Sequence, residues 1–200
     1  MMNKFILLSI TAISPAVFAG DTYIETGTTG PDGAGQVLIK YTTDSGHYWK
    51  FHFEGEGNSV KSNDWTGDPR LSAKERSIEY GFNIPVIDNL TLSPHAAFEF
   101  RNEMHEKDYD NKWIYFALGL DAKYSLPYNT YISVNTSIGD QVSNVWRRSA
   151  GIEIGWTEPR TNISIMAGYS TGTDISDKIG GKGLNEYNTE GPYLSIGWTF

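Results

Sequence analysis

The chain has 200 residues, a formal net charge of −8 and no cysteine. Without cysteine it can form neither a disulfide framework nor a thiolate metal site. The negative charge argues against a nucleic-acid partner and against a polybasic membrane anchor, because both need clustered Lys and Arg. The length suits a single domain.

Residues 1–19 are typical of a secretory signal peptide. Lys4 supplies the positive charge, residues 5–13 form an apolar stretch, Pro15 interrupts it, and the segment ends in Val-Phe-Ala, with a small residue for cleavage. The apolar stretch is too short to cross a bilayer as a helix. We therefore expect this segment to be removed, leaving one domain over residues 20–200.

The rest of the chain alternates apolar and polar residues with a period of two, which is typical of strands that have one apolar face. The last segment shows this most clearly, because Leu194, Ile196 and Trp198 share one face while Ser195 and Gly197 share the other. The alternation predicts ten strands, in chain order around residues 22–27, 37–42, 49–54, 78–84, 90–100, 114–124, 132–138, 146–156, 163–170 and 192–200.

The connections between these segments alternate in length. Every second one is short and carries Pro, Gly, Asn or Asp, the residues that tight turns require. The short connections are 43–46, 85–89, 126–129 and 158–161, and the longest of the others are 57–72 and 173–190. Short turns on one side and long loops on the other are typical of outer-membrane β-barrels, and an even number of strands would place both termini on the periplasmic side.

The apolar faces are banded along the strands. Aliphatic residues such as Leu118 and Ile152 occupy the middle of the strands, and aromatic residues occupy the ends. The expected aromatic girdle residues are Tyr41, Trp49, Tyr124, Trp146, Trp156, Trp198 and Phe200. A soluble β-sandwich or lipocalin-like barrel shares the alternation and the turns but not this banding. We therefore predict an all-β fold, an up-and-down antiparallel transmembrane β-barrel of about ten strands, with twelve as the alternative.

This location implies two kinds of partner. Outer-membrane lipid and lipopolysaccharide would surround the barrel, and Arg76 and Arg148, on lipid-facing positions near the outer rim, are candidates to bind lipopolysaccharide phosphates. The final residues 196–200, Ile-Gly-Trp-Thr-Phe, resemble the C-terminal signal that the outer-membrane barrel assembly machinery reads. We expect that machinery to be a partner through the last strand.

The opposite, polar face of the strands would line the barrel interior. The expected pore-lining residues are Lys40, Lys50, His52, Glu54, Glu79, His95, Glu99, Arg101, Asp121, Lys123, Arg147 and Glu153. Small residues of the later strands, such as Ser149, Gly151 and Gly168, would face the charged strands and could leave a narrow polar lumen open. Alternatively, the long charged side chains fill that space in a closed network, since unpaired charge inside a narrow barrel is costly.

The same residues give little support for catalysis. His52 and Glu54 share a face, as do His95 and Glu99, but a polar lumen face produces such pairs by itself, and the chain has no histidine-x-serine pair. We expect no catalytic residue, no metal site and no cofactor.

Two parts of the early chain resemble a known family. Residues 36–40 with 49–54, and 79–82 with 92–95, are similar to the early strands of the oligogalacturonate-specific monomeric porins of the KdgM type. The resemblance implies a twelve-stranded barrel with a narrow, arginine-lined pore for passive uptake of acidic oligosaccharides. This chain differs in its ten expected strands and in its lumen face, where five carboxylates accompany few arginines.

These observations leave two main hypotheses for function. The first is an outer-membrane channel, or porin, through which small polar or sugar-like solutes diffuse passively along a narrow charged lumen. The second is a non-conducting outer-membrane barrel that acts as a surface-binding, adhesion or structural protein. A lipid-modifying barrel enzyme is the least favoured. Conductance of the refolded mature protein distinguishes the first hypothesis from the second.

Overall fold

The computed structural model of the chain describes residues 20–29, 34–62, 71–105, 110–141, 145–176 and 185–200. The expected signal peptide lies outside these residues. At some strand ends the structure describes the backbone alone, at residues 29, 34, 56–62, 71–75, 101–105, 110–113, 141, 145, 173–176 and 185–190.

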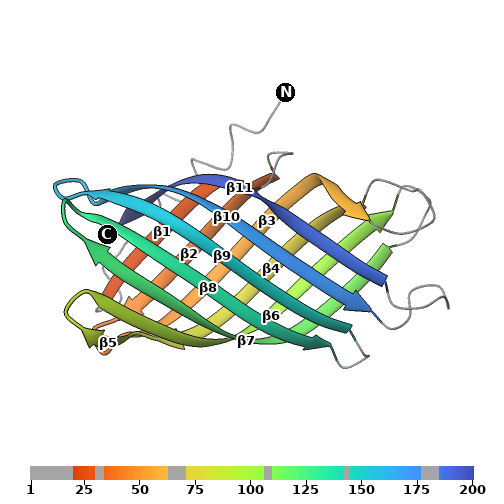
Figure 1. Cartoon of the computed structure of the whole chain (residues 1–200), viewed down its shortest axis with the longest axis horizontal. Coiled ribbons are helices and arrows are strands. Elements are labelled where there is room, and N and C mark those ends of the chain that lie inside the picture. Colours follow the sequence, from red (N-terminus) through yellow and green to blue (C-terminus); the bar gives the residue numbers. More distant parts are fainter. Residues whose placement is uncertain (1–19, 30–33, 63–70, 106–109, 142–144, 177–184) are drawn as a thin grey trace.

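Eleven strands are found in the described residues. They are β1 (Gly20–Thr29), β2 (Ala34–Thr43), β3 (His47–Ser62), β4 (Leu71–Phe82), β5 (Ile84–Ile87), β6 (Leu90–His105), β7 (Asp110–Leu126), β8 (Thr130–Gln141), β9 (Val145–Glu158), β10 (Ile163–Ser176) and β11 (Asn185–Thr199). Neighbouring strands are antiparallel, and pairing of β1 with β11 closes the sheet into a barrel (Figure 1).

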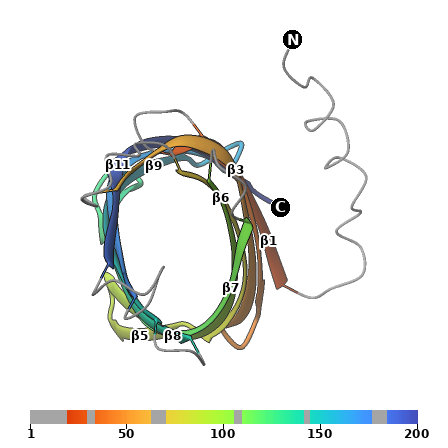
Figure 2. The ribbon, with the colours of Figure 1, turned by 90° about the vertical axis from the view of Figure 1, so that its right-hand side faces the viewer.

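Ten long strands form the barrel wall, which Figure 2 shows as a closed ring. The short strand β5 follows β4 after Asn83, and both β4 and β5 pair with β6. The prediction of an all-β antiparallel barrel of about ten strands is therefore confirmed. In the described part of the chain β5 is the one strand beyond those ten, so the twelve-stranded alternative is not what these residues form.

Several strands run farther than the sequence pattern predicts. β3 reaches Ser62 and β11 begins at Asn185, inside the segments 57–72 and 173–190 that we expected to be loops. The alternation fades there while the hydrogen-bonded ladder continues, because a strand shows the two-residue pattern only where its two faces meet different surroundings. β1 and β2 have 10 residues each, and beyond their ends β3 pairs directly with β11, Ser62 opposite Tyr187.

Tight turns join the strands at one end of the barrel. The left-handed backbone conformation that such turns require occurs at Gly46, Tyr128, Asn129 and Asn162, with φ between 55° and 83°. The expected turn at 85–89 is shorter in the structure, where Pro85 lies in β5 and only Asp88 and Asn89 form the turn. β5 pairs with β6 alone, so a residue without an N–H group is tolerated on its other edge.

The start of β1 and the end of β11 meet at this same end, where Figure 1 marks the C-terminus. Thr22 N donates to Phe200 O over 3.3 Å, and Phe200 N donates to Thr22 O over 2.8 Å. The register continues with Tyr23 opposite Thr199. These bonds close the seam between the first and last strands, so neither is left as a free edge.

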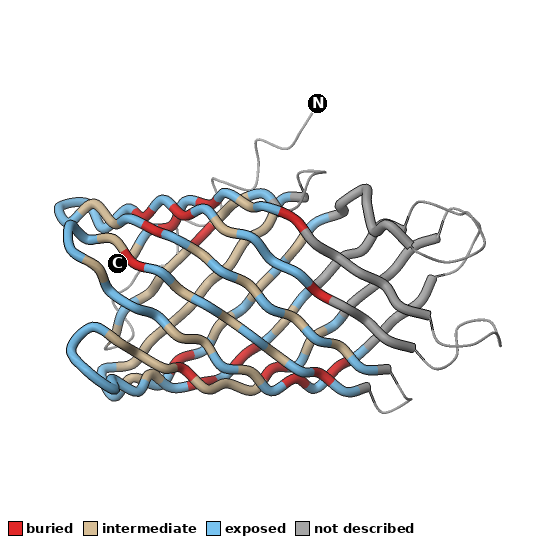
Figure 3. Tube along the Cα trace, in the orientation of Figure 1, coloured by how far each residue is buried: buried red, intermediate tan, exposed pale blue. Residues whose placement is uncertain are grey.

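Exposed and buried positions alternate along the strands (Figure 3). The outward-facing side chains of Phe98, Leu118 and Ile152 are 54%, 58% and 54% exposed, whereas the inward-facing Tyr48 and Tyr115 are 0% and 1% exposed. A soluble fold would bury such an extensive apolar face. The apolar surface of this barrel therefore lies on its outside. No helix in the described residues is long and apolar enough to span a membrane.

Candidate functional site in the barrel interior

The polar face of the wall encloses the barrel interior. Of the twelve residues that we expected to line it, all but Arg101 have described side chains. These side chains lie at strand positions that alternate with exposed apolar ones. Arg101 lies opposite Glu75 in the register of β4 and β6, and its side chain is outside the described part.

Tyrosine rings on the inner face cover glycines of the neighbouring strand. The pairs are Tyr23 on Gly197, Tyr48 on Gly81, Tyr131 on Gly155 and Tyr193 on Gly168. At each of these glycines an added methyl group would lie less than 3.0 Å from the ring. An aromatic ring placed over a glycine fills the space that the missing side chain leaves, and it stabilises the strand pair.

At these four positions the tyrosine ring therefore fills the space beside the glycine. The sequence interpretation noted the small residues and gave no role to the inward tyrosines. The signal that identifies them is a tyrosine on the polar face directly opposite a glycine, as with Tyr131 and Gly155 or Tyr193 and Gly168.

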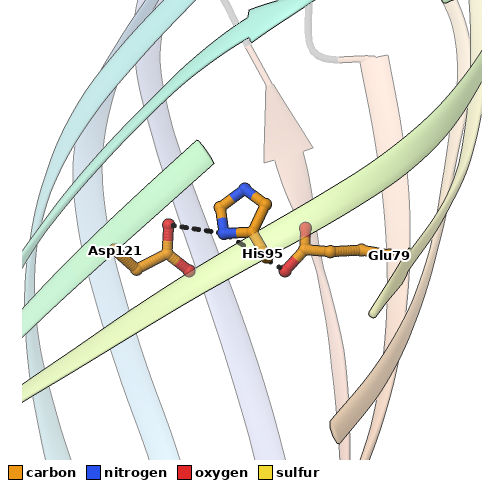
Figure 4. Close-up of side chains that lie close together, drawn as sticks. All are labelled: Glu79, His95 and Asp121. Carbon is orange, nitrogen blue, oxygen red and sulfur yellow. Dashed lines mark ion pairs between the residues drawn. The ribbon is translucent and has the colours of Figure 1, made fainter. Parts of the chain in front are cut away.

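Glu79 belongs to a cluster of side chains from β3, β4, β6 and β7, of which Figure 4 shows Glu79, His95 and Asp121, with His95 between the two carboxylates. Lys50 Nζ is 2.5 Å from Glu79 Oε2, and the Tyr48 hydroxyl donates to Glu79 Oε1 over 2.9 Å. His95 Nδ1 lies 3.8 Å from a carboxylate oxygen of Glu79 and 3.8 Å from one of Asp121. The cluster thus joins four side chains that we expected to line the lumen.

Glu79, His95 and Asp121 also offer the donor atoms of a metal site, since one ligand atom of each lies within 4.8 Å of the others. Two observations favour an ion-pair network instead. The Lys50 ammonium group already neutralises Glu79, and His95 Nδ1 is 3.3 Å from the Ser93 carbonyl oxygen, a distance that suits a donated N–H. A ring nitrogen that carries a proton cannot ligate a metal.

The histidines that raised the question of acid–base chemistry have structural partners. His95 lies between Glu79 and Asp121, and His52 Nε2 lies 3.3 Å from Gln36 Oε1. The hydroxyl of Ser93, two residues before His95, donates to Asn83 Oδ1 over 2.8 Å. These contacts hold the side chains in place and do not activate a nucleophile.

A second group of acidic side chains lies on β1 and β9. The Tyr23 hydroxyl donates to Glu25 Oε2 over 3.0 Å, and the Tyr193 hydroxyl donates to Glu153 Oε2 over 2.9 Å. Glu25 is 8% exposed, and the sequence analysis missed it because the alternation around residues 22–27 is weak. The inward tyrosines thus both cover glycines and hold carboxylates.

Two lysines pack on tyrosine rings. Lys40 Nζ lies 3.8 Å from the centre of the Tyr48 ring, and Lys123 Nζ lies 3.9 Å from the centre of the Tyr131 ring. An ammonium group over an aromatic face is held electrostatically. Both pairs join strands that a tight turn connects, β2 to β3 and β7 to β8.

An ion pair crosses the interior nearer the loop end. Arg147 Nη1 on β9 lies 3.0 Å from Glu99 Oε2 on β6, although β7 and β8 separate these strands in the wall. The two side chains must therefore extend through the interior. The guanidinium carbon also lies 6.0 Å from the centre of the Tyr115 ring. Here long charged side chains do reach across, as our second alternative expected.

Several of these inward groups retain accessible surface. The side chains of Asp121 and Lys50 are 27% and 21% exposed, and those of Arg147 and Glu99 are 12% and 13% exposed. Because they point away from the outer surface, their exposed parts face space inside the barrel. The described interior is therefore densely paired but not completely filled by side chains.

Comparison with known proteins identifies no family, since no family model and no curated protein matches the chain. Similar solved structures include a major outer membrane protein from Thermus thermophilus, with TM-score 0.46 and 10% identity over 91% of this chain and 100% of that chain. Others are the NanC porin, with TM-score 0.46 and 8% identity over 88% and 98% of the two chains, and the KdgM porin, with TM-score 0.43 and 8% identity over 90% and 99%. The resemblance is diffuse, and the function proposed next rests on this barrel's own side chains.

Proposed function

We propose that the chain is an outer-membrane channel through which small polar solutes diffuse passively. The observation that carries this proposal is the accessible surface that inward-facing charges retain inside a barrel whose outer face is apolar. Lys123, which is exposed, and Asp121, whose side chain is 27% exposed, are the clearest cases. A barrel that served only as a structural plug would need no water-accessible charge in its interior.

The outer face supports the membrane location. The outward-facing Trp146 and Trp156 are exposed near opposite ends of β9. Their ten-residue separation spans about 25 Å of height on a strand tilted by about 40°, which matches the apolar band of outer-membrane barrels. The other expected girdle residues also face outwards, and they are Tyr41, Trp49, Tyr124, Trp198 and Phe200.

The position of the chain ends supports an orientation. Gly20 and Phe200 lie at the end with the tight turns, so we place that end in the periplasm and the longer connections outside. Residues 1–19 would direct export and be removed before the barrel inserts into the outer membrane. The paired last strand β11, which precedes the terminal Phe200, would be the segment that the barrel assembly machinery binds.

The contacts inside the barrel limit what can pass. The Arg147–Glu99 pair spans the interior, and the inward tyrosines cover the glycines that would otherwise widen it. We therefore infer that the channel admits ions and solutes about the size of a single sugar unit and excludes oligosaccharides. Its selectivity would depend on size more than on charge, because the main acids are paired.

Conductance of the refolded mature chain in planar bilayers tests the proposal. We expect unitary steps, and we expect the double variant Glu99→Ala/Arg147→Ala to conduct better because its cross-lumen pair is gone. Arg148→Ala is the matched control, since Arg148 is the next residue and faces outwards. The absence of both unitary steps and swelling of liposomes in sugar solutions would refute the channel. Equal effects of Glu99→Ala/Arg147→Ala and of Arg148→Ala would refute the lumen assignment.

The reversal potential tests which charges a permeating ion meets. Lys123 and Asp121 are the more accessible cation and acid of the interior, so Lys123→Glu should shift selectivity towards cations and Asp121→Asn towards anions. An unchanged ion preference in both variants would contradict their placement in the lumen.

A non-conducting barrel is the second candidate. The observation that favours it is the depth of burial of the paired groups, because Glu79 and Glu25 are only 5% and 8% exposed. If the buried, paired side chains around Glu79 and Glu25 close the barrel completely, the wild-type protein gives no conductance. The double variant Glu99→Ala/Arg147→Ala then creates none either.

A further inference from the structure

Two arginines interrupt the apolar outer face. Among the outward strand positions whose side chains are described, Arg76 on β4 and Arg148 on β9 are the only ones that carry Lys or Arg. Both side chains are exposed. The other described strand cations point into the barrel, so the outward placement of these two is not part of the lumen network.

Both arginines lie at the level of the aromatic residues near the loop end. Arg148 is two residues from Trp146 along β9, on the side towards the middle of the barrel. Arg76 lies opposite Phe53 on β3 and opposite Phe100 on β6. Their long side chains can extend past these rings so that the guanidinium groups reach the polar zone above the hydrocarbon layer.

Neither guanidinium group is neutralised by a described side chain. Arg76 and Arg148 have no ion pair or hydrogen bond with the described residues. The outward-facing Asp140 lies opposite Trp146 in the register, and it has no ion pair with Arg148. A charged group that faces lipid without a partner is costly, so an anion from the membrane is the expected partner.

We propose that Arg76 and Arg148 each bind a phosphate group of lipopolysaccharide in the outer leaflet. The planar guanidinium fork matches a phosphate and can donate two parallel hydrogen bonds to it. β6, β7 and β8 separate β4 from β9 on one side and five strands separate them on the other, so the two sites would hold different lipid molecules. The inference rests on the outer-membrane location proposed above.

Binding of purified lipopolysaccharide to the detergent-solubilised mature protein tests this inference. Arg76→Glu/Arg148→Glu should weaken binding about tenfold or more, which corresponds to about 1.4 kcal/mol. The matched control is Arg160→Glu, an exposed arginine at the tight-turn end, and it should bind like the wild type. Arg76→Lys/Arg148→Lys should fall between them, because it keeps the charge and loses the fork.

Three results would overturn the inference. They are wild-type binding by the double glutamate variant, equal weakening by Arg160→Glu, and equally tight binding of phosphatidylethanolamine vesicles, which carry phosphate without the lipopolysaccharide head group. A heat-modifiable gel shift confirms that each variant is folded. Conductance is measured in bilayers free of lipopolysaccharide, so a conducting protein that fails to bind the lipid refutes this inference and leaves the channel intact.

Discussion

Replacing Gly155 with alanine tests the packing of tyrosine rings on the inner wall. The three heavy atoms nearest to the added Cβ would all belong to the Tyr131 side chain, each less than 3.0 Å away. Tyr131 is 8% exposed and lies beneath the Lys123 ammonium group, so its ring has little room to move. Inserting a methyl group into such a packed site costs about 1–3 kcal/mol of the free energy of unfolding.

Without the Tyr131 ring, Gly155→Ala should stabilise the protein and no longer destabilise it. In a Tyr131→Ala background the new methyl group no longer meets the ring, and alanine restricts the unfolded chain more than glycine does. We then expect Gly155→Ala to stabilise by about 0.4–1 kcal/mol, which gives a coupling energy of more than about 1 kcal/mol between the two positions. Gly139→Ala is the control, because its Cβ would make ordinary contacts of 3.5–3.7 Å and should change stability by less than about 0.5 kcal/mol.

Urea unfolding in lipid vesicles, followed by tryptophan fluorescence, measures all four variants and the wild type. The gel shift between folded and heated protein provides a second measure of the folded fraction. A cost of Gly155→Ala that does not depend on the ring would show that the tyrosine does not occupy this space. A control change at Gly139 that costs as much as Gly155→Ala would refute the packing argument altogether.

Lys50→Met should destabilise the barrel by about 3 kcal/mol or more, because it leaves the buried Glu79 carboxylate without its cation. Urea unfolding measures this loss, with Lys123→Met as the control. Equal losses of unfolding free energy in the two variants would contradict a special role for the Lys50–Glu79 pair. Glu158, the last residue of β9, accepts hydrogen bonds from the Thr161 hydroxyl and backbone N–H, and these bonds hold the pKa of its carboxyl below the usual range. Because the folded pKa lies below the unfolded value of about 4.3, the stability that Glu158 adds over Glu158→Ala is present at neutral pH and lost as the pH falls through the lowered pKa. Thermal unfolding of both proteins from neutral to strongly acidic pH measures this difference, and a difference that stays constant on acidification would contradict the assignment.

The strands can be predicted wherever the two faces of the wall have different surroundings. The strand predicted over residues 114–124 lies inside β7, because outward Phe116 and Leu118 alternate with inward Tyr115 and Ala117. Towards the loop end the pattern weakens, and β3 and β11 continue there without it. Hydrogen bonding to neighbours decides where those strands end, and a local pattern contains no information about neighbours.

The contacts inside the barrel also fall into those that the sequence can predict and those that it cannot. Lys40 on Tyr48 and Lys123 on Tyr131 join strands connected by tight turns, and a tight turn fixes the register that brings such pairs together. Tyr131 on Gly155 joins β8 and β9 far along both strands from the connection between them, and the alternating pattern alone does not fix the register of these strands. The Arg147–Glu99 pair depends on the curvature of the closed barrel, so no pairwise strand argument could predict it.

The distribution of paired and accessible charge bears directly on how this barrel would select solutes. Glu79 and Glu99 each have a cation within 3.0 Å, so their charges are largely cancelled for a passing ion. The residual field comes from more accessible groups of both signs, Asp121 and Lys123, which lie on the same strand β7. Because attraction to one is offset by repulsion from the other, neither anions nor cations would be strongly favoured. A channel built in this way selects mainly by size, and the Arg147–Glu99 pair would set that size.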